Sequence, residues 1–150
     1  MRDALLIQLE TRWEKRKTMK TEPEAECKTL TEAYARLGAT VRNPRRTWSA
    51  ITDDGKAVVV TLWTDRFLDL EQSQYSTFGL SGKGWIDRPE NRRRAEHLRH
   101  AMSKRGGLFR SIIVTPSDRM HSRIVERRVG PQMRVTEIDE ATGRFKAERA

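Results

Sequence analysis

The sequence is poor in the residues that form covalent cross-links and many metal centres. Cys27 is the only cysteine among 150 residues, so no intramolecular disulfide can form. A zinc site built from several cysteines is excluded for the same reason. Only three histidines occur, and no third ligand accompanies His97 and His100 at their i, i+3 spacing. We therefore expect no metal, and no motif indicates a cofactor.

Long hydrophobic runs are also missing. No stretch approaches the roughly 20 apolar residues that a membrane-spanning helix needs. Residues 1–10 carry Arg2, Asp3 and Glu10, which does not fit the apolar segment of a secretory signal. We therefore expect a cytoplasmic protein without a membrane partner. A chain of this length is expected to fold as a single domain, residues 1–150.

Acidic residues are in the minority. Asp and Glu number 21 against 30 Lys and Arg, which gives a formal net charge of +9. Residues 1–75 are nearly neutral, with 13 basic and 12 acidic residues, whereas residues 83–134 hold 14 basic and 5 acidic residues. A one-sided positive field attracts polyanions, of which nucleic acid is the most common in a cell. The charge pattern thus predicts a nucleic-acid partner, through residues 83–134.

Two N-terminal segments have the pattern of helices. Apolar residues at 3/4 spacing predict an amphipathic helix over residues 3–18. A second helix is expected over residues 30–37, because Thr29 and Glu32 have the capping-box spacing. Gly38 is suited to end it, since glycine adopts the left-handed backbone conformation found after many helices.

The chain then changes to a strand pattern. Strands are expected over residues 47–52 and 56–65, separated by the turn residues 53–55 with the sequence Asp-Asp-Gly. The second strand carries apolar residues on both faces and should therefore be central in its sheet. Trp48 and Trp63 are expected to be core aromatics.

The second half combines one helix with several strands. Residues 67–86 predict a long loop, and Asp87 is suited to cap a helix that runs to about Lys104. Turn-forming residues, among them 130–131, separate four expected strands at residues 108–115, 123–129, 133–138 and 144–147. The fold class is therefore α+β: two N-terminal helices, a β-hairpin, a basic helix and four further strands in a mostly antiparallel sheet.

The basic helix is the leading candidate for a binding surface. Guanidinium groups suit phosphate, because they stay charged and offer two parallel donors. The residues expected to meet phosphates are Arg92, Arg93, Arg94, Arg99, Lys104, Arg105 and Arg110. Three aromatic residues of the preceding loop, Tyr75, Phe78 and Trp85, would stack on bases that are exposed. The leading hypothesis is a non-catalytic nucleic-acid-binding domain, for DNA in particular.

Two alternatives remain open. A protein-interaction module or inhibitor would place the same basic surface on an acidic protein partner. A small metal-dependent nuclease would use clustered carboxylates such as Asp65 and Asp69 to hold magnesium. No known nuclease or hydrolase motif is present, so no catalytic residue is predicted. The oligomeric state is left open, a homodimer included.

The middle of the chain also has a recognisable pattern. It consists of Leu37-Gly38-Ala39-Thr40, Trp48-Ser49-Ala50, Asp54-Gly55, residues 59–65 and Leu98-Arg99-His100. These residues resemble those of a group of small bacterial proteins of uncharacterised function, over roughly residues 30–115. The resemblance implies a shared fold, and it supplies neither an activity nor catalytic residues.

Overall fold

A six-stranded sheet forms the centre of the computed structural model, which describes residues 26–150. The strands lie in the order β1-β2-β4-β5-β6-β3. Their bounds are β1 Ser49–Ile51, β2 Val58–Trp63, β3 Gln74–Ser76, β4 Leu108–Pro116, β5 Ile124–Ile138 and β6 Phe145–Arg149. Only β2 and β4 pair in parallel, and the other neighbours are antiparallel. The α+β class with a mostly antiparallel sheet is therefore confirmed, whereas the helix predicted at 3–18 lies outside the described residues.

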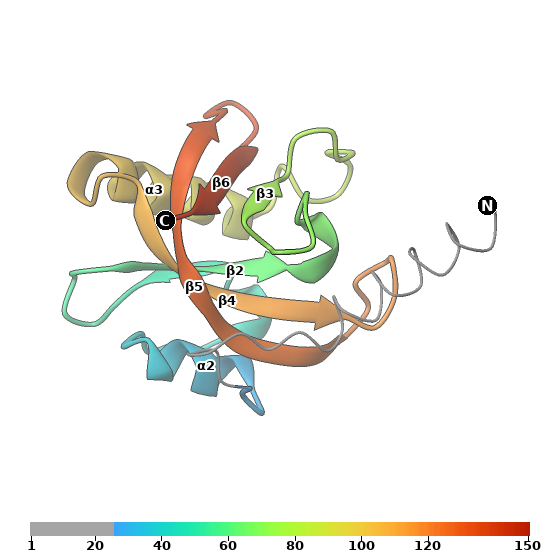
Figure 1. Cartoon of the computed structure of the whole chain (residues 1–150), viewed down its shortest axis with the longest axis horizontal. Helices are drawn as coiled ribbons and strands as arrows, with labels where there is room; N and C mark the ends of the chain where they lie inside the picture. Colours follow the sequence, from blue (N-terminus) through green and yellow to red (C-terminus); the bar gives the residue numbers. More distant parts are fainter. Residues whose placement is uncertain (1–25) are drawn as a thin grey trace.

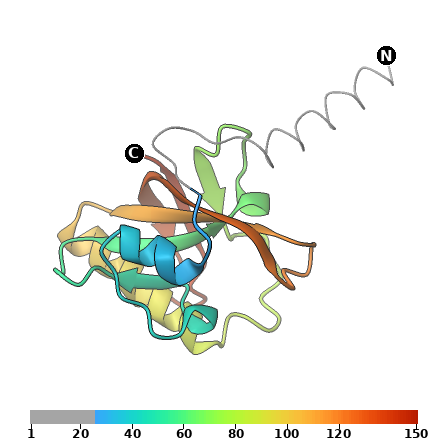
Figure 2. The ribbon, with the colours of Figure 1, turned by 90° about the horizontal axis from the view of Figure 1, so that it is seen from below.

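Two helices cover opposite faces of this sheet (Figures 1 and 2). Helix α2, Leu30–Arg36, packs Ala33 and Tyr34 against one face. Helix α3, Pro89–Lys104, packs Leu98 against the other. Residues of β2 alternate between these two cores, because successive side chains of a strand point to opposite faces. The prediction that this strand is central and buried on both faces is confirmed.

Both ends of α2 form as the sequence predicts. The Thr29 hydroxyl accepts a hydrogen bond from the Glu32 backbone N–H at 3.1 Å. The Glu32 carboxylate accepts one from the backbone N–H of Lys28 at 2.9 Å. Gly38 follows the helix with a φ of +90°, which few residues other than glycine adopt. Helix α3 differs, because Arg88 and not Asp87 precedes its first residue and no side chain caps it.

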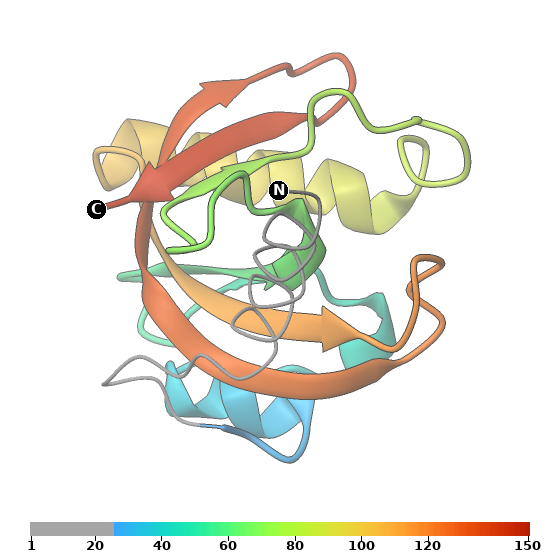
Figure 3. The same cartoon turned by 45° about the vertical axis from the view of Figure 1, so that its right-hand side comes forward.

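Strand β5 is one continuous strand, so the turn predicted at residues 130–131 is wrong (Figure 3). Ile112 of β4 pairs with Val129, and Arg110 pairs with Gln132. Gly130 and Pro131 therefore both lie opposite Ser111, which is the arrangement of a β-bulge. The Ser111 hydroxyl donates to the carbonyl of Pro131 at 2.6 Å. A bulge accommodates the proline without a chain reversal, since the extra residue needs no ladder hydrogen bond.

The bulge requires a residue without a side chain at position 130. A Cβ atom there would lie 2.5 Å from the Ser111 hydroxyl oxygen and 2.8 Å from carbon atoms of Ile113. We expect Gly130→Ala to lower the free energy of unfolding by about 1–3 kcal/mol, the usual cost of overpacking a core. Urea denaturation measures this free energy. Thr136→Ala, at an exposed position of the same strand, should change the free energy of unfolding by less than about 0.5 kcal/mol. Equal effects would contradict the steric explanation.

The segment predicted as a long loop contains the edge strand β3. Its Tyr75 pairs with Ala147 of β6 and is only 1% exposed. The Tyr75 ring stacks on Phe145 with 5.6 Å between centroids and meets the edge of Phe67 at 5.1 Å. Tyr75 is therefore a core residue of β3 and not an exposed aromatic of a loop, so its ring is not at the surface for bases to reach. Between residues 26 and 150, no helix has both the length and the apolar character to cross a membrane.

Candidate functional site

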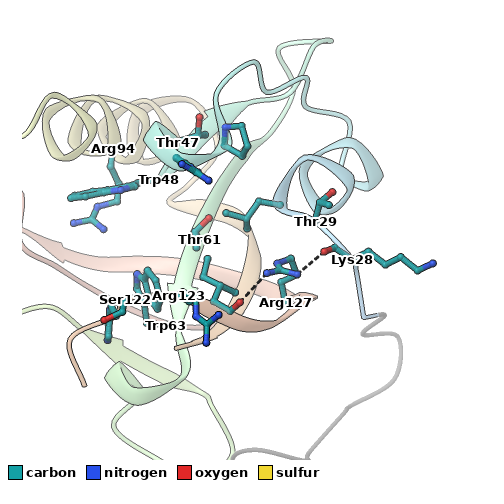
Figure 4. Close-up of a pocket in the computed structure, with 15 residues that line it drawn as sticks. Lys28, Thr29, Thr47, Trp48, Thr61, Trp63, Arg94, Ser122, Arg123 and Arg127 are labelled. Atoms are coloured by element: carbon teal, nitrogen blue, oxygen red, sulfur yellow. Dashed lines mark hydrogen bonds between the residues drawn. The ribbon is translucent and has the colours of Figure 1, made fainter. Parts of the chain in front are cut away.

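A cleft of about 880 Å³ opens on the surface where distant parts of the chain meet (Figure 4). It lies between the start of α2, the short 3-10 helix η1 (Pro44–Arg46), strand β2 and the connection from β4 to β5. Helix α3 contributes one residue, Arg94. We call it the tryptophan cleft, and the lining residues used below are Lys28, Arg45, Trp48, Thr61, Trp63, Arg94, His121, Ser122, Arg123 and Arg127.

Two tryptophans give the cleft its aromatic surfaces. Trp48 directly precedes β1, and Trp63 is the last residue of β2. Both are only partly buried: Trp63 packs against the core under α2, as predicted, whereas Trp48 belongs to neither core cluster. The His121 ring stacks on Trp63 with 4.1 Å between centroids. Figure 4 shows Trp48 and Trp63 in different parts of the cleft, with Thr61 between them.

The cleft is positively charged. Its lining contains five Lys and Arg side chains, and the described lining residues include no Asp or Glu. Arg127 donates to the backbone carbonyls of Lys28 at 2.6 Å and Ile124 at 3.1 Å, so these bonds orient it without neutralising its charge (Figure 4). A concave surface lined by one sign of charge concentrates the field and attracts ions of the opposite sign.

Arg94 is the most unusual residue of the cleft. It is only 5% exposed, and among residues 26–150 it forms no ion pair. One guanidinium nitrogen donates to the Asn91 side chain at 3.1 Å, while its Nε has no partner in the described part of the chain. The guanidinium carbon lies 5.0 Å from the centre of the Trp48 ring and 5.1 Å from that of Phe145. The sequence hypothesis placed Arg94 on an exposed helix face, and the structure corrects this.

A buried and incompletely bonded guanidinium is costly. Burial lowers the pKa of Arg94 to about 10, so the group still carries its charge at neutral pH. A buried donor without an acceptor costs roughly 1–3 kcal/mol. A ligand acceptor that reaches this guanidinium would offset part of that cost.

A second pocket of about 460 Å³ lies on the other side of η1, and Thr47 lines both. Its basic lining residues are Arg42, Arg46 and Arg93, and its described lining again includes no carboxylate. Sequence reasoning missed η1, because residues 1–75 are nearly neutral in total. Three arginines within residues 42–46, next to Trp48, were the available signal.

His97 lines the second pocket and is held by the Ser49 hydroxyl, whose oxygen lies 2.7 Å from its Nδ1. Burial, and next the nearby Arg93, lower the pKa of His97 below its usual 6.5. Below about pH 6.5 the unfolded chain therefore takes up a proton at this histidine before the folded protein does. The free energy of unfolding should fall as the pH drops below 6.5.

Chemical denaturation between pH 5 and 7.5 checks this expectation. His97→Gln removes the titrating group and should flatten that part of the pH profile. Ser49→Ala keeps the buried imidazole and should retain the slope. An unchanged slope in His97→Gln would show that other groups cause the pH dependence.

The other predicted cations lie on or next to α3, with the exception of Arg110. Arg92, Arg93, Arg99 and Lys104 are exposed on α3, and Arg105 is exposed directly after its last residue. Arg99 pairs with Glu140 at 2.9 Å, and Arg105 donates to the backbone carbonyl of Gly55 at 3.0 Å. Arg110 belongs to β4, on the sheet face covered by α2, because it alternates in step with Ile112. The structure therefore separates Arg110 from the helix arginines.

The remaining predicted aromatic residues have structural contacts. Phe78 is half-buried, and the Lys146 ammonium lies 5.5 Å from the centre of its ring. Trp85 donates its indole N–H to the carbonyl of Ser81, and its ring lies 5.8 Å from the Arg94 guanidinium carbon. Neither ring lines the tryptophan cleft.

The carboxylates considered for a nuclease are engaged elsewhere. Asp65 lies 2.7 Å from Nε2 of His121, and Asp69 accepts hydrogen bonds from the backbone of the turn at residues 73–74. Asp53 and Asp54 precede β2, whereas Asp65 follows it, so the strand separates them. In the part of the chain that the structure describes, no group of three His, Cys, Asp or Glu residues is placed to hold a metal ion.

Comparison with models of protein families, with curated proteins and with solved structures finds no match for this chain. The functional interpretation therefore depends on the chemistry of the cleft and its neighbouring pocket.

Proposed function

We propose that this protein binds nucleic acid through the tryptophan cleft and the adjoining second pocket, with DNA as the ligand expected from the sequence. One observation carries the proposal. The tryptophan cleft and the second pocket, here together called the two hollows, share η1 and are lined by Lys and Arg, without a carboxylate among their described lining residues. Phosphate groups are the usual partners of such surfaces.

The aromatic part of the cleft favours nucleic acid over an acidic protein. Side chains of Asp and Glu would use the cations but would offer no flat ring to Trp48 and Trp63. A nucleotide combines an anionic phosphate with a flat base, and bases stack on aromatic side chains whatever their identity. The hydroxyls of Thr61 and Ser122 add polar groups at the same place.

Fluorescence anisotropy with a labelled 20-nucleotide strand, repeated between about 50 and 200 mM salt, tests the proposal. Six cations of the two hollows lie on exposed residues: Lys28, Arg42, Arg45, Arg46, Arg93 and Arg123. If each neutralises one phosphate, the logarithm of the affinity should fall linearly with the logarithm of the salt concentration, with a slope of about −4. Absence of binding to single strands and to duplex at 50 mM salt would overturn the proposal.

A further inference from the structure

We infer that the tryptophan cleft binds a single unpaired nucleotide, its base against the tryptophans and its phosphate on the surrounding cations. The inference rests on the proposed function and deepens it, because it states which part of the nucleic acid enters the cleft. Exposed arginines alone would bind phosphates along any strand. A cleft of about 880 Å³ can also hold a base, since pockets for small molecules measure roughly 300–1,000 Å³.

The lining of the cleft suits an unpaired base better than a stacked base pair. Trp48 directly precedes β1 and Trp63 ends β2, so both lie at the open end of the β1–β2 hairpin. Residues from the start of α2, η1 and the β4–β5 connection line the rest of the site, which is a hollow between segments and not a flat platform. A base inside a duplex has both faces covered by its neighbours, and its ring cannot reach the tryptophans unless it leaves the stack. An unpaired base is already free to do so. Single strands, strand ends and free nucleotides share this chemistry.

The buried guanidinium supplies the second observation. Arg94 lines the cleft beside Trp48, and its Nε has no hydrogen-bond acceptor among residues 26–150 (Figure 4). Phe145 and Trp48 surround the guanidinium with aromatic carbon, so water has little access to it. A carbonyl or ring nitrogen of a base, or a phosphate oxygen, is the kind of acceptor that this donor lacks. Two cations of the cleft lining, Arg45 and Arg123, are exposed and suit the phosphate.

Thr61 lies between the tryptophans, and its hydroxyl is 2.7 Å from the Tyr34 hydroxyl. Burial raises the pKa of Tyr34 far above its usual value of 10, so the phenol keeps its proton. This pair of hydroxyls is fixed in place by the packing of α2 on β2. Of the two, Thr61 lines the cleft, whereas Tyr34 is fully buried behind it, so the Thr61 hydroxyl is the polar group offered to a ring held against the tryptophans.

The experiment compares three ligands at equal salt: a labelled 12-nucleotide strand, its duplex, and a deoxynucleoside monophosphate followed by tryptophan fluorescence. We expect the single strand to bind at least tenfold more tightly than the duplex. Trp48→Ala and Trp63→Ala should each weaken single-strand binding by about 5- to 150-fold, the range found for removal of a base-stacking ring. Duplex binding should change less than twofold.

Phe78→Ala is the matched control, because Phe78 is a half-buried ring outside the cleft; it should leave single-strand binding within twofold. Trp48→Phe keeps a ring and should retain most of the affinity. A strand of abasic sites, tested on the unmodified protein, should bind as weakly as the duplex, which gives a result even if a tryptophan variant fails to fold.

Equal, salt-dependent binding of single strand, abasic strand and duplex would overturn this inference and leave the proposed function intact. Absence of binding to every polymer would overturn the proposed function. If the monophosphate then still binds and Trp48→Ala abolishes it, the nucleotide site stands and its ligand is a free nucleotide. Loss of all binding, monophosphate included, would overturn both.

Discussion

The double variant Arg45→Glu/Arg123→Glu is expected to weaken nucleic-acid binding by about 100-fold at roughly 100 mM salt. Both side chains are exposed at the tryptophan cleft, on η1 and on the β4–β5 connection. A salt slope of about −0.7 per phosphate makes each contact worth about fivefold at this concentration. Reversing two charges removes two attractions and adds two repulsions, so the loss exceeds that of two deletions. Anisotropy at fixed salt measures it.

The matched control is Arg134→Glu/Arg149→Glu, which changes the net charge by the same amount. Arg134 and Arg149 are exposed on β5 and β6 and line neither hollow. The affinity of this variant for nucleic acid should fall by no more than about fivefold, because only the overall electrostatic field of the protein changes. If both double variants lost affinity equally, binding would follow net charge, and the cleft would not be the binding site.

Replacing Phe145 by alanine should lower the free energy of unfolding by about 3–5 kcal/mol, the usual cost of removing a buried phenyl ring. Phe145 is 0% exposed at the start of β6. Its ring stacks on Tyr75 and lies 5.1 Å from the guanidinium carbon of Arg94. The substitution therefore removes core packing and also opens the surroundings of a buried charge. Urea denaturation followed by circular dichroism measures the change.

Phe78→Ala serves again as the comparison, since that ring is half-buried and has the Lys146 ammonium of β6 over its face. Phe78→Ala should lower the free energy of unfolding clearly less than Phe145→Ala does. A change below about 1 kcal/mol in Phe145→Ala would contradict the placement of this ring in the core between β6 and α3.

Features that depend on neighbouring residues could be predicted from the sequence. The start of α2 at Thr29 and its end at Gly38 follow from capping chemistry within a few residues. The hairpin of β1 and β2 follows from the Asp-Asp-Gly turn and the flanking alternation. Strand β5 was divided wrongly, because a Gly-Pro pair forms a turn or a bulge depending on the strand beside it. Ser111 of β4, about 20 residues earlier, decides between them.

The burial of Arg94 could have been predicted from the sequence. It precedes Leu98 by four residues and Ala101 by seven, so helical spacing puts it on the same stripe as both. All three are buried in the structure. The prediction that Arg94 is exposed followed from its charge and not from its position on the helix. An arginine on an apolar stripe is informative because its burial needs a compensating partner.

The tryptophan cleft itself could not be predicted. Its cations and rings come from the segment before α2, from η1 and the residues that follow it, from β2, α3 and β5, and from the β4–β5 connection, which are far apart in the sequence. Only the packing of the two helices on opposite sheet faces brings them together. The sequence pattern indicates that residues 83–134 are basic. It does not indicate that η1, which belongs to the nearly neutral residues 1–75, lies beside some of these basic residues.

The most direct test of the account is a titration of the ¹⁵N-labelled protein with a short single strand, followed by amide and indole chemical shifts. Binding in the cleft predicts the largest changes at residues 28–30, 44–48, 61–63 and 121–127, with the indole signals of Trp48 and Trp63 among them. Changes confined to the exposed cations of α3, such as Arg92, Arg99 and Lys104, would contradict the central claim and return the binding site to the exposed basic helix.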